Sequence, residues 1–220
     1  MIYNPQTLIP IIHTDQYDDI ATSFLEHYYK EGLYTPQRIP ILEIARDKIG
    51  LDVQFLCIDE DQKIFGITVF EDGLIDLYNP EEALYYSHFF KRKSIIIDPA
   101  ATIKTNLGCQ NNTIAHECVH WYKHRMYYKM QKYTLPRQAK FCRCSIQDIT
   151  FLVEEERILE QQATGIAPRI LMPSNTFTEI ANKLNIRPGF DNSKSINEIA
   201  AFFEVSKQSA IIRLRECGIL

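Results

Sequence analysis

The amino-acid sequence predicts an α+β protein in which helices flank a small antiparallel sheet. Three observations carry this prediction. Apolar residues recur at helical intervals before residue 50, short β-rich runs fill residues 51–98, and long stretches of helical pattern follow residue 112. With 220 residues, the chain is long enough to bury a sizeable hydrophobic core.

Two helices are expected before the sheet. Between residues 17 and 30 the apolar side chains are spaced as on one face of a helix, and Gly32 follows as a stop signal. A second helix is expected after Pro40. Gly50 suits its C-cap, because glycine adopts the left-handed conformation that ends many helices.

The predicted sheet consists of short runs of apolar, β-branched and aromatic residues. Asp61-Gln62 and Asp72-Gly73 separate consecutive runs and are typical of hairpin turns, so the sequence predicts an antiparallel meander. The strands are expected at residues 51–58, 63–70, 74–78 and 94–98.

Two long helices are expected in the second half of the chain. Residues from about 112 to 129 contain neither glycine nor proline, so they predict one continuous helix. The polar stretch 131–147 is interpreted as a connector. A further helix is expected at about 149–167. Pro168 should end it, because proline lacks a backbone donor and clashes with the preceding turn.

The C-terminal part of the chain predicts a helical segment that resembles a helix-turn-helix. We divide the chain into a domain at residues 1–173 and a helical segment at residues 174–220, which is expected to pack on that domain. Ser206 is a suitable N-cap for the last helix. That helix carries the basic residues Lys207, Arg213 and Arg215. DNA binding through this segment is therefore an alternative function.

Composition excludes several classes of protein. A formal net charge of −4 provides no general attraction to nucleic acid. The N-terminus lacks the pattern of a signal peptide, and no apolar run approaches the roughly 20 residues that span a bilayer. We therefore expect a cytoplasmic protein without disulfides. Cys142 and Cys144 form the one closely spaced cysteine pair, and an accessory metal or redox role for them stays open.

The motif His116-Glu117-Cys118-Val119-His120 predicts a zinc site. Side chains four residues apart lie on one face of a helix, so His116 and His120 can bind the same ion. Zinc lowers the pKa of a bound water to about 7, and Glu117 is positioned to act as the base that activates it. The alternative is a pair of surface histidines beside an ordinary glutamate. Trp121 favours a helix that is buried on one side.

A catalytic zinc site needs a third protein ligand, which the spacing alone does not fix. The metzincin pattern would require glycine and histidine where this chain has Lys123 and Met126. Spacing favours Glu160 over Glu156 only modestly, and an acidic run is commonly a solvated face. The candidate ligands on the next helix are Glu154, Glu155, Glu156 and Glu160.

The segments TIAHECVHWYKH and ILEQQATGIAPRILMP resemble the zinc motifs of ImmA/IrrE-type metallopeptidases. The resemblance implies that His116, His120 and Glu160 are the zinc ligands and that Glu117 is the catalytic residue. His124 occupies the place of a further histidine that the family often has, and it is a candidate for hydrogen bonding to a ligand or to the transition state; the alternative is an exposed helix histidine. Thr164 departs from the family pattern, which has Asn or Asp there.

The same resemblance implies a fold and a function. It implies an α+β, zincin-like fold in which a small antiparallel sheet packs against helices and the motif lies on a central helix. It also implies a zinc-dependent endopeptidase that cleaves a helix-turn-helix repressor controlling mobile elements or stress genes. The alternatives are a non-catalytic zinc-containing regulator and the DNA-binding protein described above.

Overall fold

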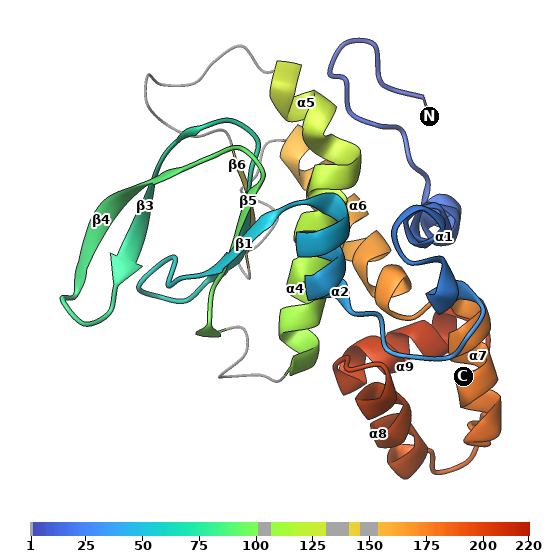
Figure 1. Cartoon of the computed structure of the whole chain (residues 1–220). Helices are drawn as coiled ribbons and strands as arrows, with labels where there is room; N and C mark the ends of the chain where they lie inside the picture. The colour runs from blue at the N-terminus through green and yellow to red at the C-terminus, as the bar shows by residue number, and fades with distance from the viewer. Residues whose placement is uncertain (1, 101–106, 131–140, 146–153) are drawn as a thin grey trace.

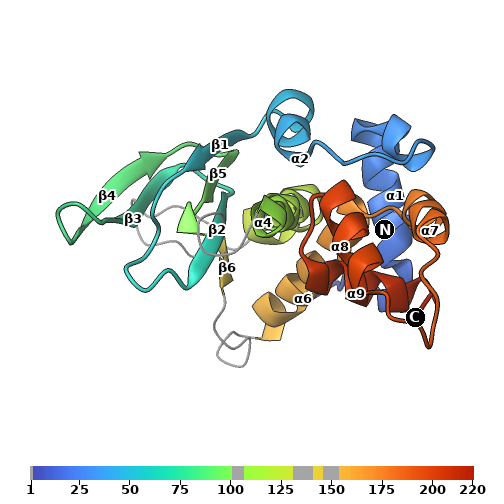
Figure 2. The ribbon, with the colours of Figure 1, turned by 90° about the horizontal axis from the view of Figure 1, so that it is seen from below.

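The computed structural model describes residues 2–100, 107–130, 141–145 and 154–220 of the chain. Helix α4 (Leu107–Val119) lies between the β-strands on one side and helices α1 (Tyr17–Tyr28) and α6 (Glu154–Leu171) on the other, as Figures 1 and 2 show. The predicted α+β class is therefore confirmed.

The main sheet has the strand order β1-β5-β2-β6, and β3 and β4 form a separate antiparallel pair. Strand β2 is antiparallel to both of its neighbours, whereas β1 and β5 are parallel. The strands are β1 (Asp52–Phe55), β2 (Ile64–Val69), β3 (Gly73–Asn79), β4 (Leu84–Phe90), β5 (Ser94–Ile97) and β6 (Phe141–Ser145).

The small antiparallel sheet is present, but the predicted meander is wrong in its connections. Strand β5 is buried along its whole length and therefore occupies an interior position between β1 and β2. The sequence did not predict β4, which is exposed at nearly every position. Residues 131–147 were expected to form a connector, but strand β6 lies within that stretch and pairs with β2. Such pairing is non-local and leaves little signal in the strand itself.

The helix predicted at 112–129 begins earlier than expected and has three parts. It continues from α4 through a π-helical turn, η4 (His120–His124), into α5 (Arg125–Met130). The helix predicted after Pro40 is confirmed, and Gly50 ends it with a φ of 74°. The remaining helical elements are η1 (Thr14–Gln16), η2 (Lys30–Leu33), α2 (Ile41–Glu43), η3 (Ile44–Ile49), α7 (Ser174–Lys183), α8 (Ser193–Phe202) and α9 (Lys207–Glu216).

Helix α6 runs through Pro168 instead of ending there. The proline costs one backbone hydrogen bond, but apolar residues on both sides of it are fully buried. Ile166, Ala167 and Ile170 each have no exposed surface, so the apolar contacts of this turn outweigh the lost bond. Arg169 also donates a side-chain hydrogen bond to the carbonyl of Gly165, at 2.5 Å. Tertiary packing therefore overrides the local stop signal.

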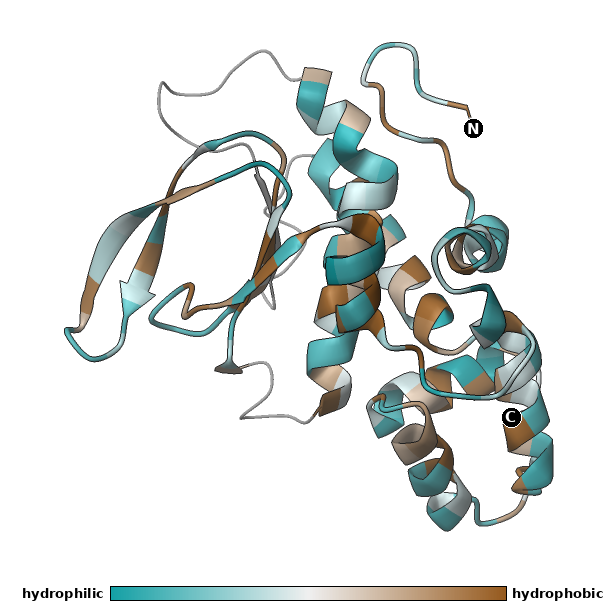
Figure 3. Ribbon diagram, in the orientation of Figure 1, coloured by the Kyte–Doolittle hydropathy of each residue, from teal (hydrophilic) through white to brown (hydrophobic). Residues whose placement is uncertain are grey.

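One hydrophobic core joins the N-terminal segment, the central helices and the C-terminal helices. It extends along the chain from Ile9 to Leu214. Figure 3 shows hydrophobic residues gathered where α4 and α6 lie side by side. A smaller cluster, which includes Ile67 and Phe90, fills the space between β2 and the β3–β4 pair. The larger core includes side chains from both predicted parts of the chain. The division into two parts at residue 173 stays a prediction.

A buried arginine connects the C-terminal helix α9 to helix α1. Arg213 is 1% exposed, and its guanidinium donates to the carbonyl of Met172 at 3.0 Å and to the carboxylate of Asp18 on α1. Burial alone would raise the pKa of Asp18, but the hydrogen bond and charge of Arg213, together with Arg169, hold it below its usual range. The stabilisation from this carboxylate is therefore present at neutral pH.

Among the helices of the described residues, we find none that is both long and apolar enough to cross a lipid bilayer.

We predict that Arg213→Leu lowers the free energy of unfolding by about 2–3 kcal/mol, since it removes charged hydrogen bonds in the core. Arg215→Leu, on the exposed side of α9, is the matched control and should change it by less than about 0.5 kcal/mol. Urea denaturation measures both. Below the ordinary Asp pKa of about 3.9 the difference between wild type and Arg213→Leu should shrink, because Asp18 becomes protonated. If the difference in the free energy of unfolding did not change with pH, the ion pair between Arg213 and Asp18 would not be its cause.

Candidate metal centre

His116 and His120 are held by consecutive helical elements that are buried on several sides. His116 lies near the end of α4 and is 3% exposed, and His120 begins η4 and is fully buried. Ala115, Cys118 and Val119 between and beside them are also fully buried. Apolar contacts therefore fix the helix on which both imidazoles sit. The π-helical turn after Val119 is a feature found frequently at functional sites.

The structure brings His116, His120 and Glu160 together around one point. The Nε2 atoms of the two histidines are 2.9 Å apart. The Glu160 carboxylate lies 3.0 Å from His116 Nε2 through Oε2 and 3.1 Å from His120 Nε2 through Oε1. Glu160 comes from α6, 44 residues after His116 along the chain, and is 8% exposed. The packing of α4 against α6 thus creates the cluster.

The donor set fits a divalent cation such as zinc. Two imidazole nitrogens and a carboxylate are ordinary zinc ligands, with bonds of about 2.0–2.2 Å. A tetrahedral ion with such bonds separates its ligand atoms by roughly 3.3 Å, which is close to the spacing seen here. Burial would raise the pKa of Glu160, but the charges and hydrogen bonds of His120 and His116 hold it well below its usual range. The carboxylate is therefore ionised and able to bind a metal.

Glu117 lies beside this cluster and is fully buried against strand β2. The hydroxyl of Thr68 donates to Glu117 Oε2 at 2.6 Å. Gly66, two residues earlier on β2, lies so close that a Cβ atom there would come within 2.6 Å of Glu117 Oε1. Burial raises the pKa of Glu117, although His116, His120 and the Thr68 hydroxyl oppose the change. A carboxyl with a raised pKa is suited to accept and return a proton.

His124 lies behind the cluster. It is fully buried, and its Nδ1 lies 3.0 Å from Nδ1 of His120, on the opposite side of that ring from the cluster. Its Nε2 lies 3.1 Å from the side-chain oxygen of Gln162 on α6. Burial and the neighbouring His120 hold the pKa of His124 far below its usual range, so the ring is neutral. The catalytic role expected for His124 stays a prediction.

The other predicted carboxylates lie outside the cluster. Glu154 is exposed and forms an ion pair with Arg157 at 2.5 Å. Glu156 is partly buried, and burial together with Glu160 and Glu155 raises its pKa. The side chains of Cys142 and Cys144 lie outside the described residues, so the accessory role considered for them stays open.

Sequence reasoning did not identify Gly66, Thr68 or Gln162. The first two belong to β2, and Thr68 lies 49 residues before Glu117 along the chain. No local pattern marks a threonine or glycine that contacts a helix so far away. Gln162 is two positions after Glu160, but its amide has no property that separates it from the neighbouring Gln161 until the fold buries it.

Comparison with known proteins gives one finding. The model of a peptidase family, described as the IrrE N-terminal-like domain, matches residues 63–215. This range includes every residue of the cluster, strand β2, helices α7 and α8, and α9 up to Arg215. No curated protein matches the chain.

We predict that Glu160→Ala reduces the zinc content of the purified protein from about one ion per chain to near none, because two imidazoles alone leave the ion weakly held. Glu156→Ala is the matched control on the same helix and should retain the ion. Atomic absorption on dialysed protein measures both. If Glu156→Ala lost zinc and Glu160→Ala retained it, the third ligand would be Glu156 and not Glu160.

Proposed function

The chain belongs to the peptidase family of IrrE N-terminal-like domains, and from this membership and the buried His116–His120–Glu160 cluster we propose that it is a zinc-dependent endopeptidase. The cluster carries the proposal, because a peptidase of this type needs a bound cation with a base beside it. His116, His120 and Glu160 are the proposed zinc ligands, and Glu117 is the proposed base.

In the proposed mechanism, the cluster holds the zinc ion and Glu117 transfers the proton. Zinc, when bound, supplies a Lewis acid that polarises the scissile carbonyl and acidifies the attacking water. Glu117 removes a proton from that water as its oxygen forms the new bond to the carbonyl carbon. Glu117 then gives the proton to the leaving amine when the C–N bond breaks. The raised pKa of Glu117 supports this double use, since the group must both accept and return the proton.

Thr68 and Gly66 support the assignment of Glu117 as the base. The Thr68 hydroxyl fixes one carboxylate oxygen at 2.6 Å, and the missing side chain of Gly66 leaves room for the carboxyl group. A base with a fixed orientation loses less entropy on reaching its reacting position. The contact also anchors the motif helix to strand β2.

We propose a cytoplasmic helix-turn-helix repressor as the substrate. This part of the proposal rests on the resemblance to ImmA/IrrE-type metallopeptidases. DNA binding by the chain itself is the weaker alternative. Arg213, one of the basic residues of the last helix, is buried in an ion pair with Asp18. It therefore does not face a phosphate backbone. A non-catalytic zinc-containing regulator is disfavoured by the acidic residue held beside the cluster.

We predict that Glu117→Gln retains zinc and loses at least about 100-fold in peptide cleavage, since the amide cannot accept the proton. Intact mass spectrometry of a small helix-turn-helix repressor that is co-expressed with the chain measures cleavage. Undiminished cleavage by this variant would exclude the proposed base. Cleavage of a mixed peptide library by the wild type, without cleavage of the repressor, would exclude only the substrate.

We also predict that Thr68→Val lowers the cleavage rate about tenfold and leaves the zinc content unchanged, because one charged hydrogen bond to Glu117 is lost. Thr176→Val is the matched control. Thr176 is equally buried, but its hydroxyl donates to the carbonyl of Pro173, away from the cluster. An equal loss of rate in both variants would mean that the Thr68 hydroxyl contributes only to stability.

A further inference from the structure

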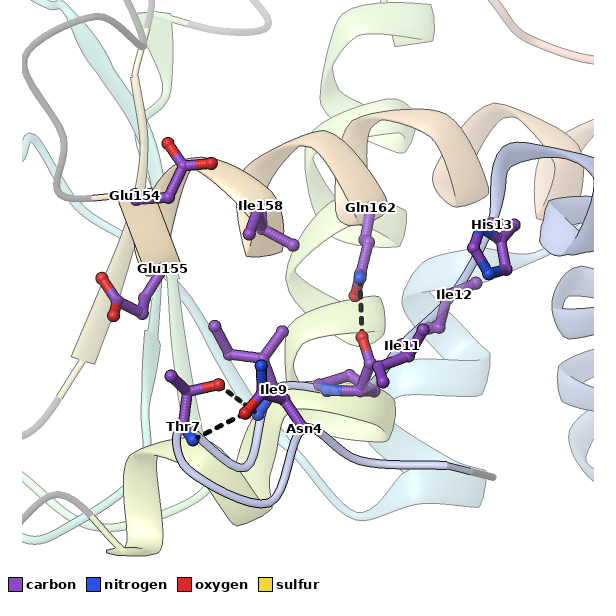
Figure 4. Close-up of a pocket in the computed structure, with 11 residues that line it drawn as sticks. Asn4, Thr7, Ile9, Ile11, Ile12, His13, Glu154, Glu155, Ile158 and Gln162 are labelled. Carbon is purple, nitrogen blue, oxygen red and sulfur yellow. Dashed lines mark hydrogen bonds between the residues drawn. The ribbon is translucent and has the colours of Figure 1, made fainter.

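A chain of buried polar contacts links the proposed zinc ligand His120 to the N-terminal segment. His120 Nδ1 lies 3.0 Å from His124 Nδ1, and His124 Nε2 lies 3.1 Å from Gln162 Oε1. The Gln162 amide nitrogen then donates to the carbonyl oxygen of Pro10 at 2.8 Å. This last contact joins residues 152 positions apart along the chain. Figure 4 shows the Gln162 side chain extending from α6 to the N-terminal segment.

The contact with Pro10 sets the direction of every hydrogen bond in this series from Gln162 to His120. A backbone carbonyl can only accept, so the NH₂ group of Gln162 faces Pro10 and its oxygen faces His124. His124 must then donate from Nε2. Its Nδ1 is an acceptor in the neutral ring and accepts a hydrogen bond from the N–H that His120 carries on Nδ1. In the neutral ring of His120, the lone pair is then on Nε2, on the side of His116 and Glu160.

Burial makes this order of donors and acceptors obligatory. His120 and His124 are fully buried and Gln162 is 3% exposed. In such a site a donor or acceptor facing the wrong partner costs about 1–3 kcal/mol, since water does not replace the lost bond. Reversing any one contact would reverse those that follow. The tautomer of His120 therefore depends on the orientation of the Gln162 amide.

The N-terminal segment holds the Pro10 carbonyl in a fixed place. Ile9 is 5% exposed and belongs to the hydrophobic core, and its carbonyl accepts from the backbone nitrogen of Asn4 at 2.9 Å. The nitrogen of Leu8 donates back to the Asn4 carbonyl at 2.8 Å. Tyr3 and Pro10 also pair as an isolated antiparallel bridge. The segment is thus a closed loop that is anchored by its own bonds.

This anchored loop also forms one wall of a cavity of about 320 Å³. Gln162 and Ile158 of α6 form the facing wall, as Figure 4 shows. The amide of Gln162 therefore crosses from α6 to the loop at the edge of this space. Without the Pro10 acceptor, the amide would be free to turn over and present its NH₂ group, instead of its oxygen, to His124.

We propose that Gln162, held by the carbonyl of Pro10, is a positioning residue that acts through His124 to keep the Nε2 lone pair of His120 directed at the metal site. The inference rests on the proposed zinc centre. It extends that centre to the first residues of the chain, which lie outside the part matched by the family model. Second partners of metal-binding histidines commonly fix the tautomer and the ring orientation in this way.

Gln162→Leu should lower the zinc affinity about 10- to 100-fold, because His124 loses the acceptor that fixes its tautomer. Competition with a chromophoric chelator measures the affinity. Gln161→Leu is the matched control, since Gln161 is the exposed neighbour on the same helix, and it should bind zinc as the wild type does. Unchanged zinc affinity in Gln162→Leu would overturn the proposal.

Gln162→Glu separates metal positioning from stability. Its carboxylate still accepts from His124 Nε2 but no longer donates to Pro10, so the variant should unfold at lower urea concentration and yet retain zinc affinity within about threefold of the wild type. If Gln162→Glu loses as much zinc affinity as Gln162→Leu, the proposed acceptor role is wrong.

Nitrogen NMR of the histidine rings tests the tautomers directly, with and without zinc. We expect His124 protonated on Nε2 in the wild type and a mixture of tautomers in Gln162→Leu. A wild-type His124 protonated on Nδ1 would overturn the inference. A wild type with the expected tautomers and no zinc affinity would instead exclude the proposed function, so the two failures can be distinguished.

Discussion

The close approach of three electron-pair donors inside the core is the constraint on which the rest of the structure depends. Two imidazole nitrogens and a carboxylate lie within 3.1 Å of one another in a site with almost no exposed surface. Without a cation, lone pairs so arranged repel one another unless protons are shared between them. Helices α4 and α6 must therefore hold them together, and the fully buried Ala115 and Ala163 allow these helices to approach closely.

The sequence predicts the parts of the site that one helix carries and leaves open the parts that need two elements. Helical spacing is enough to bring His116 and His120 to one face. The choice of Glu160 over Glu156 required either the family resemblance or the fold, because both glutamates share a face of the same helix. Thr68 and Gln162 gave no signal, since their partners lie 49 and 38 residues away along the chain.

The errors at the level of the fold have the same origin. Turn residues indicated where the chain reverses but not which strands become neighbours, so the parallel pairing of β1 with β5 was not predicted. Pro168 indicated a helix end because its local cost is known, whereas the burial of Ile166, Ala167 and Ile170 that offsets this cost depends on the other helices. Local rules are reliable here only where tertiary contacts do not compete with them.

Helix α6 connects these observations, because it carries contacts to α4 and η4, to the N-terminal loop, to α1 and to α9. Glu160 reaches the histidines of α4 and η4, Gln162 reaches the N-terminal loop, and Arg169 forms ion pairs with Asp18 of α1 and Glu216 at the end of α9. A shift of α6 along its axis would disturb all of them together. The C-terminal helices thus stabilise the position of the His116–His120–Glu160 cluster through α6. Arg213 of α9 belongs to the same arrangement, because it is buried against Asp18, the residue of α1 that also pairs with Arg169.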